Sequence, residues 1–127
     1  MNIEDITVVI TSFRSTKKIF SCLKSIGTKV KIIIVENSND LTLKKEAEKL
    51  YSNLKCHVSP ENLGYAKGNN LGLSKVKSEY ALILNPDAFL ENNVIDRLLV
   101  LARDHRDFAI IGPAKQNEYS NLDIYEN

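Results

Sequence analysis

Short runs of apolar, mostly β-branched residues alternate along the chain with segments in which apolar residues recur at helical spacing. The runs predict five buried strands, at residues 6–11, 30–35, 55–58, 80–84 and 108–111. The periodic segments predict four helices, at residues 15–26, 43–54, 65–76 and 94–105. Continuously apolar strands joined by helices are typical of a mainly parallel sheet with helices on both faces. We therefore predict a three-layer α/β/α sandwich.

Residues that end or begin these elements support the same boundaries. Gly27 follows the first predicted helix and is a suitable C-cap. Asn39 or Asp40 is expected to cap the start of the second. Beyond the fifth strand the segment 116–127 is polar and has no evident partner.

Size and composition fit a single domain over residues 1–127. An apolar content of 43% and a charged content of 26% are ordinary for a globular protein and exclude a disordered chain. Lys and Arg total 17 against 16 Asp and Glu, so the net charge of +1 gives no argument for a nucleic-acid partner. Any anion site must therefore be local.

Nothing in the sequence predicts a membrane span, because the longest apolar runs are about six residues and a span needs ~20. The N-terminus is acidic and lacks an apolar signal core. Cys22 and Cys56 form no CxxC motif and are expected to be buried free thiols in a reducing compartment. We expect the protein in the cytoplasm, either free or peripheral at the inner face of the membrane.

Familiar phosphate-binding motifs are absent. The segment after the first strand is Thr-Ser-Phe-Arg, residues 11–14, so the GxGxxG of dinucleotide-binding folds is missing. Gly64 and Gly68 lead into Asn69 and Asn70 and not into the Lys-Ser/Thr of a P-loop. A phosphoacceptor receiver would carry an acidic pair after strand one and an Asp after strand three. In this chain those two places are occupied by Thr11-Ser12 and by Ser59-Pro60-Glu61.

Four polar segments follow predicted strands, and parallel strands bring such segments to one edge of the sheet. The first, residues 11–14, is by itself explained by a loop with a helix cap. The second begins with Glu36 and Asn37; its carboxylate could accept hydrogen bonds from a ribose or base, or it could organise an Asx-rich turn. Both readings of the second segment remain open.

The third segment, residues 61–72, is the most informative. It holds three of the five glycines, and Gly64 and Gly68 remove side chains where another group must approach the backbone. Apolar residues at helical spacing predict a stripe on the inward face of this helix: Ala66, Leu73 and Val76. Asn69 and Asn70 are expected on the same face. Inward amides are costly without partners, so they favour a polar ligand. A Gly-rich loop with capping asparagines is the alternative.

The fourth segment, Leu-Asn-Pro-Asp at residues 84–87, ends a buried strand. Pro86 stops the ladder and presents Asp87 at the edge of the sheet. A hard divalent cation needs only one or two protein carboxylates when it also takes diphosphate oxygens. In isolation, a simple turn with Asp87 as a helix cap is the better explanation of this segment.

Together, residues 8–13, 33–38, 62–70 and 82–87 resemble family 2 glycosyltransferases with the GT-A fold. The run Asn-x-Gly-Tyr-Ala-x-Gly-Asn-Asn with Leu-Asn-Pro-Asp is most similar to the rhamnosyltransferase branch, and the resemblance covers residues 5–115. It implies a Rossmann-like GT-A domain that uses a UDP- or dTDP-sugar. The implied reaction is inverting transfer to a hydroxyl of a saccharide or lipid-linked acceptor, in cell-surface polysaccharide synthesis.

The resemblance also assigns roles to residues. Thr11 and Phe13 would line the base pocket, Glu36 would bind base or ribose, and Asp87 would hold Mg²⁺ or Mn²⁺. The other implied contacts to the nucleotide-sugar come from Asn37, Asn62, Gly64, Gly68, Asn69, Asn70 and Asn85.

Two departures qualify the resemblance. Asn85 is neutral where the family's DxD motif begins with an acid, so we expect weaker or altered metal dependence. The family's general base lies on a later segment, and Glu118, Asp123 and Glu126 come too soon after the fifth strand to match it. We expect the base beyond Asn127, in which case the chain is the N-terminal part of a GT-A fold, shortened naturally or by truncation.

Two other functions are weighed against a glycosyltransferase. One is a non-catalytic module that binds nucleotide-sugars. The other is a nucleotidyltransferase, which would need a Gly-rich basic loop after strand one, whereas residues 11–14 contain no glycine. A homo-oligomer would be one way to cover apolar surface that an incomplete fold leaves exposed.

Overall fold

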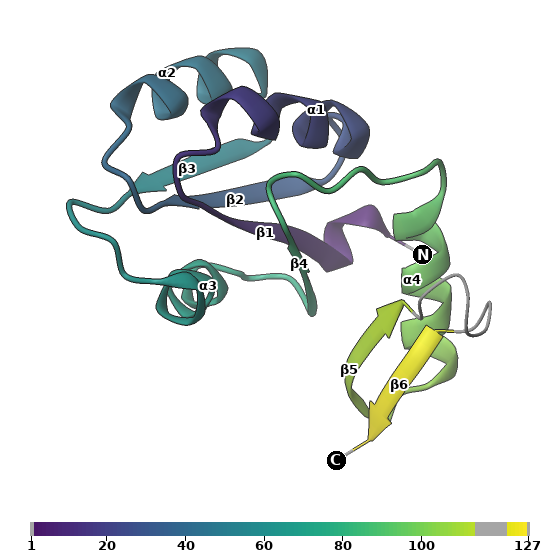
Figure 1. The fold of residues 1–127 in the computed structure, drawn as a ribbon. Helices are drawn as coiled ribbons and strands as arrows, with labels where there is room; N and C mark the ends of the chain where they lie inside the picture. Colours follow the sequence, from purple (N-terminus) through teal and green to yellow (C-terminus); the bar gives the residue numbers. More distant parts are fainter. Residues whose placement is uncertain (1, 114–121, 127) are drawn as a thin grey trace. The chain divides into compact units, whose positions relative to one another are not determined.

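A computed structural model describes residues 2–113 and 122–126, which fall into two compact units. The larger unit, Asn2–Asn92, contains a short 3-10 helix at Ile3–Asp5 (η1), a four-stranded sheet and three α-helices (Figure 1). The smaller unit begins at Asn93 and contains one α-helix and a two-stranded sheet.

All four strands of the larger sheet are parallel, in the order β3-β2-β1-β4. Their register aligns the last residues of three of the strands, since Ser12 pairs with Glu36 and Glu36 with Val58. The last residue of the fourth strand, Leu84, pairs with Ile10. The carboxyl ends therefore lie along one edge of the sheet. The strands are β1 (Ile6–Ser12), β2 (Lys31–Glu36), β3 (Leu54–Val58) and β4 (Tyr80–Leu84).

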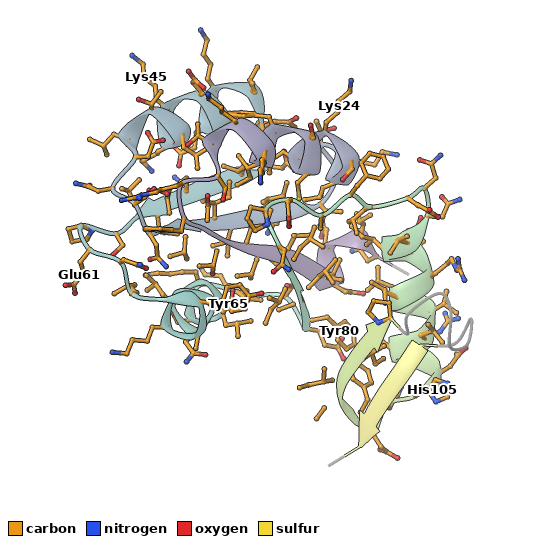
Figure 2. The ribbon with its side chains drawn as sticks, viewed as in Figure 1. Lys24, Lys45, Glu61, Tyr65, Tyr80 and His105 are labelled. Atoms are coloured by element: carbon orange, nitrogen blue, oxygen red, sulfur yellow. The ribbon has the colours of Figure 1, made fainter. Side chains whose placement is uncertain are left out.

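Helices cover both faces of this sheet, which confirms the predicted layers. Helices α1 (Thr16–Ile26) and α2 (Leu41–Leu50) lie over one face and α3 (Tyr65–Ser74) over the other (Figure 1). Lys24 on α1 and Lys45 on α2 point away from the sheet (Figure 2). The apolar residues at helical spacing in α1 are buried, as expected from the periodicity: Ile19, Cys22, Leu23 and Ile26.

Both predicted caps are confirmed. Gly27 ends α1 with φ +84°, a conformation that glycine adopts without steric cost. The Asp40 carboxylate accepts hydrogen bonds from the backbone N–H groups of Thr42 and Leu43 at the start of α2.

Side chains of α2 form hydrogen bonds with backbone groups on the open side of the edge strand β3. Glu48 Oε1 accepts a hydrogen bond from the Cys56 backbone N–H (2.9 Å), and Lys44 Nζ donates to the Cys56 carbonyl (2.7 Å). The hydrogen bond from Cys56 is the largest cause that lowers the pKa of Glu48. This arrangement satisfies backbone groups that an edge strand otherwise leaves open. Cys22 and Cys56 are buried free thiols, as predicted.

Helix α3 packs on β1 and β2 through its smallest residues. Its buried positions are Gly68, Asn69 and Gly72. A Cβ atom on Gly72 would lie 2.4 Å from Cγ1 of Val9, so only glycine lets the helix approach this closely. The predicted inward positions of Ala66 and Asn70 are wrong, since both residues are exposed. The face that α3 turns toward the sheet is therefore the one that carries its glycines, and not the predicted apolar stripe.

In the smaller unit, α4 (Val94–Asp104) and β5 (Phe108–Pro113) form where the sequence predicts them. The sequence predicts β5 as a fifth strand of the mainly parallel sheet, and this prediction is wrong. This strand does not close the parallel sheet, because it pairs antiparallel with β6 (Leu122–Glu126) in a separate two-stranded sheet. Strand β6 was not predicted; the alternation of Leu122 and Ile124 with polar residues was the available signal.

We predict that Gly72→Ala lowers the free energy of unfolding by up to about 2 kcal/mol, as measured by urea denaturation. Overpacking against Val9 costs about 1–3 kcal/mol, and the ~1 kcal/mol that alanine gains over glycine in a helix offsets only part of that cost. In a Val9→Ala background the same substitution should cost less, because the clashing methyl group is gone. Equal costs in both backgrounds would contradict this packing.

Candidate functional site

The ends of β1 and β2 are joined to each other and to the α3 segment by hydrogen bonds. The Asn37 backbone N–H donates to the Ser12 carbonyl (2.8 Å), and Asn37 Nδ2 donates to the Gly64 carbonyl (3.1 Å). The Thr11 hydroxyl donates to Asn69 Oδ1 (2.6 Å) within the buried face of α3. The first three polar segments therefore form one cluster.

The segment after β4 is tied to the same cluster. The Tyr65 hydroxyl, on the first residue of α3, donates to Asn85 Oδ1 (2.8 Å). On its other side this segment lies along α1, where Cys22 Sγ donates to the Asn85 carbonyl (3.6 Å) and the Leu90 backbone N–H donates to Ser25 Oγ (3.0 Å). All four strand-end segments thus meet at one edge of the sheet, as the parallel topology predicts.

Glu36 lies at the centre of the turn between β2 and α2 and is fully buried. Its Oε2 atom accepts hydrogen bonds from the backbone N–H groups of Ser38 (3.0 Å) and Asp40 (2.7 Å). Its Oε1 atom accepts from the Ser38 hydroxyl. Of the two interpretations that the sequence left open, these contacts support the turn-organising one. Contact with a base or ribose stays a prediction.

The same turn is fastened to the start of α1. The Thr16 hydroxyl donates to Asp40 Oδ2 (2.6 Å), and the Arg14 backbone N–H donates to Ser38 Oγ (3.2 Å). The hydrogen bond from Thr16 is the main reason that the pKa of Asp40 lies below its usual value. The sequence analysis assigns no role to Thr16 or Ser38. The feature that points to them is their position close after the ends of predicted strands.

The two glycines of the third segment serve different purposes. A Cβ atom on Gly68 would lie 2.5 Å from Thr11 Cγ2 and 2.9 Å from Asn37 Nδ2. The groups that approach Gly68 are therefore the chain's own side chains. Gly64 has open space around it but adopts φ +81°, which favours glycine.

Burial divides the predicted site residues into two sets. Thr11, Glu36, Asn37, Gly68 and Asn69 are buried and support the cluster from below, while the exposed residues are Phe13, Asn62, Gly64, Asn70, Asn85 and Asp87. Only the exposed set is open to solvent.

Two buried polar atoms of the cluster have no hydrogen-bond partner within the described residues: Ser12 Oγ and Asn37 Oδ1. Such atoms cost free energy unless water or a ligand satisfies them. Both atoms lie at the strand ends where the polar segments meet, at the last residue of β1 and the first residue after β2.

The four polar segments carry exposed charged residues of both signs: Arg14, Glu61, Lys67 and Asp87. The Arg14 guanidinium lies 5.0 Å from the centre of the Phe13 ring, so a cation and an aromatic face stand together at the end of β1. Asp87 carries an exposed carboxylate beyond β4. Together with burial of the thiol, which is the larger cause, its charge raises the pKa of Cys22 to about 11.

Within the described residues no group of three His, Cys, Asp or Glu side chains could hold a metal ion. Asp87 therefore fits a divalent cation only as a single carboxylate that shares the ion with ligand oxygens. Of the late acidic residues, Glu118 lies outside the described residues. The described part of the chain also has no helix with the length and apolar character to cross a membrane.

Comparison with known proteins gives a family match over nearly the whole chain. The family described as "Glycosyl transferase family 2" matches residues 7–126. No curated protein shows significant sequence similarity to the chain.

Solved structures share the fold at low sequence identity. Residues 1–349 of S. aureus TarS superpose with a TM-score of 0.69 at 18% identity, covering 99% of this chain and 47% of that one. A second S. aureus TarS structure gives 0.72 at 22% identity, covering 95% of this chain and 23% of that one. The mannosyltransferase PcManGT from Pyrobaculum calidifontis, in complex with GDP-Man and Mn²⁺, gives 0.78 at 14% identity, covering 96% and 44%.

In all three comparisons this chain spans less than half of the other chain's length. At such identities the likeness establishes the fold, which is the α/β arrangement that the sequence predicts.

We predict different consequences for the two neighbouring amides of α3. Asn69→Ala leaves the buried Thr11 hydroxyl without its acceptor and should lower the free energy of unfolding by about 1–3 kcal/mol. Asn70→Ala, at an exposed position, should change it by less than about 0.5 kcal/mol. Chemical denaturation of both variants checks this, and equal losses would contradict the assigned phase of α3.

Proposed function

This chain belongs to glycosyl transferase family 2, and from that premise we propose that its strand-end cluster binds a nucleotide-diphospho-sugar donor. The observation that carries the proposal is the hydrogen-bonded convergence of four polar segments at the carboxyl edge of a parallel sheet. Ligands of open α/β sheets bind at this edge.

In this proposal the nucleotide lies over β1 and β2. The exposed Phe13 ring would stack on the base, and Arg14 beside it would attract the negative diphosphate. Thr11, Asn37 and Asn69 would hold the floor of the site, and Asn62, Gly64 and Asn70 would border the donor. UDP- and dTDP-sugars are the first donors to test, and the GDP-Man of the mannosyltransferase structure adds a third base.

Asp87 is proposed to hold Mg²⁺ or Mn²⁺ together with diphosphate oxygens. Such an ion offsets negative charge on a departing diphosphate. The Mn²⁺ in the mannosyltransferase complex supports the use of a divalent cation in this fold. Because Asn85 is neutral, the cation would depend on one protein carboxylate at this turn.

The proposed reaction is transfer of the sugar to an acceptor hydroxyl with inversion. Inversion needs a general base, and the proposal assigns that role to none of the residues of the strand-end cluster. Rhamnosyl transfer, a saccharide or lipid-linked acceptor, a role in cell-surface polysaccharide synthesis and a cytoplasmic location stay proposals from the sequence resemblance. The single domain over residues 1–127 and self-association stay predictions too.

A non-catalytic nucleotide-sugar-binding module is the second candidate. It is favoured by two carboxylates of the cluster, Glu36 and Asp40, because both accept hydrogen bonds from backbone groups and organise the turn between β2 and α2. An enzyme should slowly hydrolyse the sugar nucleotide in the presence of Mn²⁺, whereas a module should bind it without turnover.

We predict that UDP, dTDP or GDP binds about tenfold more tightly with Mn²⁺ than without it, a gain of about 1.4 kcal/mol. Asp87→Ala should remove that gain and leave the metal-free affinity nearly unchanged, because the carboxylate acts through the cation. Isothermal titration calorimetry measures both quantities. Asp96→Ala, on α4, is the control, and an unchanged Mn²⁺ effect in Asp87→Ala would refute the metal assignment.

A further inference from the structure

The link between α3 and the β4 turn depends on one side-chain contact, the hydrogen bond from the Tyr65 hydroxyl to Asn85 Oδ1 at 2.8 Å. Tyr65 is the first residue of α3, and its side chain is half exposed (Figure 2). Packing against the core does not account for a tyrosine at this position. Its hydroxyl reaches the residue that replaces the first acid of the DxD motif.

The backbone of Asn85 is held separately. Its carbonyl accepts from the Ala88 backbone N–H (3.1 Å) and from Cys22 Sγ (3.6 Å), which fixes the turn that carries Asp87. The side-chain amide of Asn85 is exposed, and its oxygen accepts the hydrogen bond from Tyr65. Within the described residues no hydrogen bond uses the Asn85 NH₂ group.

A fixed amide and a rotating one differ in what they offer a ligand. With its oxygen turned to Tyr65, Asn85 presents two N–H donors at the surface, two residues before the Asp87 carboxylate. Donors that are already oriented bind an anion more tightly, because less side-chain freedom is lost on binding.

We propose that Tyr65 is a positioning residue that holds the Asn85 amide with its NH₂ group toward the donor diphosphate. This inference rests on the proposed function, and it adds how a neutral residue serves where an acid is expected. Asn85 would act as a hydrogen-bond donor to phosphate oxygens and leave the cation to Asp87.

The test is a double-mutant cycle on the affinity for UDP, dTDP or GDP, whichever binds the wild-type chain, measured by calorimetry without divalent cation. Tyr65→Phe removes only the hydroxyl and should weaken binding about two- to tenfold, the range for one net hydrogen bond. Asn85→Ala should weaken it at least as much. Adding Tyr65→Phe to Asn85→Ala should then change nothing, because Tyr65 acts through Asn85.

Two further measurements separate positioning from a merely structural role. The corresponding nucleoside monophosphate, which lacks the second phosphate, should bind wild type and Tyr65→Phe equally. Asn85→Asp still accepts from Tyr65 but lacks N–H donors, so its metal-free affinity should fall while the gain from Mn²⁺ grows.

The matched control is Tyr51→Phe, which removes the same hydroxyl from a residue at the other end of the sheet, where α2 ends. It should leave nucleotide affinity unchanged. Thermal unfolding of every variant verifies that the fold persists.

The outcomes distinguish the two levels of the proposal. If the wild-type chain binds no nucleoside diphosphate, the proposed function is wrong and this inference is wrong with it. Binding by wild type with additive losses in the cycle, or with an equal loss for the monophosphate, overturns the positioning role of Tyr65 alone.

Discussion

The close packing of α3 on β1 and β2 is the constraint on which the rest of the site depends. Gly68 and Gly72 leave no room for a Cβ atom against Thr11, Asn37 and Val9. Because the helix sits this low, Asn69 reaches Thr11 within the buried layer, and the start of α3 reaches both the end of β2 and the turn after β4. One helix thereby joins polar segments that are far apart in the sequence.

The elements and their edge were predictable because the physical signals are local. Apolar runs and helical periodicity define β1 to β4 and α1 to α3, and parallel topology then brings the strand ends together whatever their detailed contacts. The partner of β5 was not predictable in the same way. It depends on long-range pairing with β6, whose alternating pattern is only five residues long.

Individual side chains were harder to place because a motif does not say which face of a helix or turn a residue takes. Asn69 and Asn70 are adjacent and chemically identical, yet one is buried and the other exposed. The sequence was equally consistent with a Glu36 side chain that faces a ligand. In the structure its carboxylate accepts three hydrogen bonds from the turn that follows β2. Buried polar residues thus hold the strand ends together, and the exposed ones face solvent.

The central claim is that a nucleoside diphosphate binds at the carboxyl edge of this sheet. Backbone amide shifts of the ¹⁵N-labelled chain, followed during titration with UDP, dTDP or GDP and Mg²⁺, test it most directly. The account predicts changes confined to the segments that follow β1, β2 and β4 and to the start of α3. Changes centred on the opposite edge, at residues 27–31 and 51–53, would contradict it.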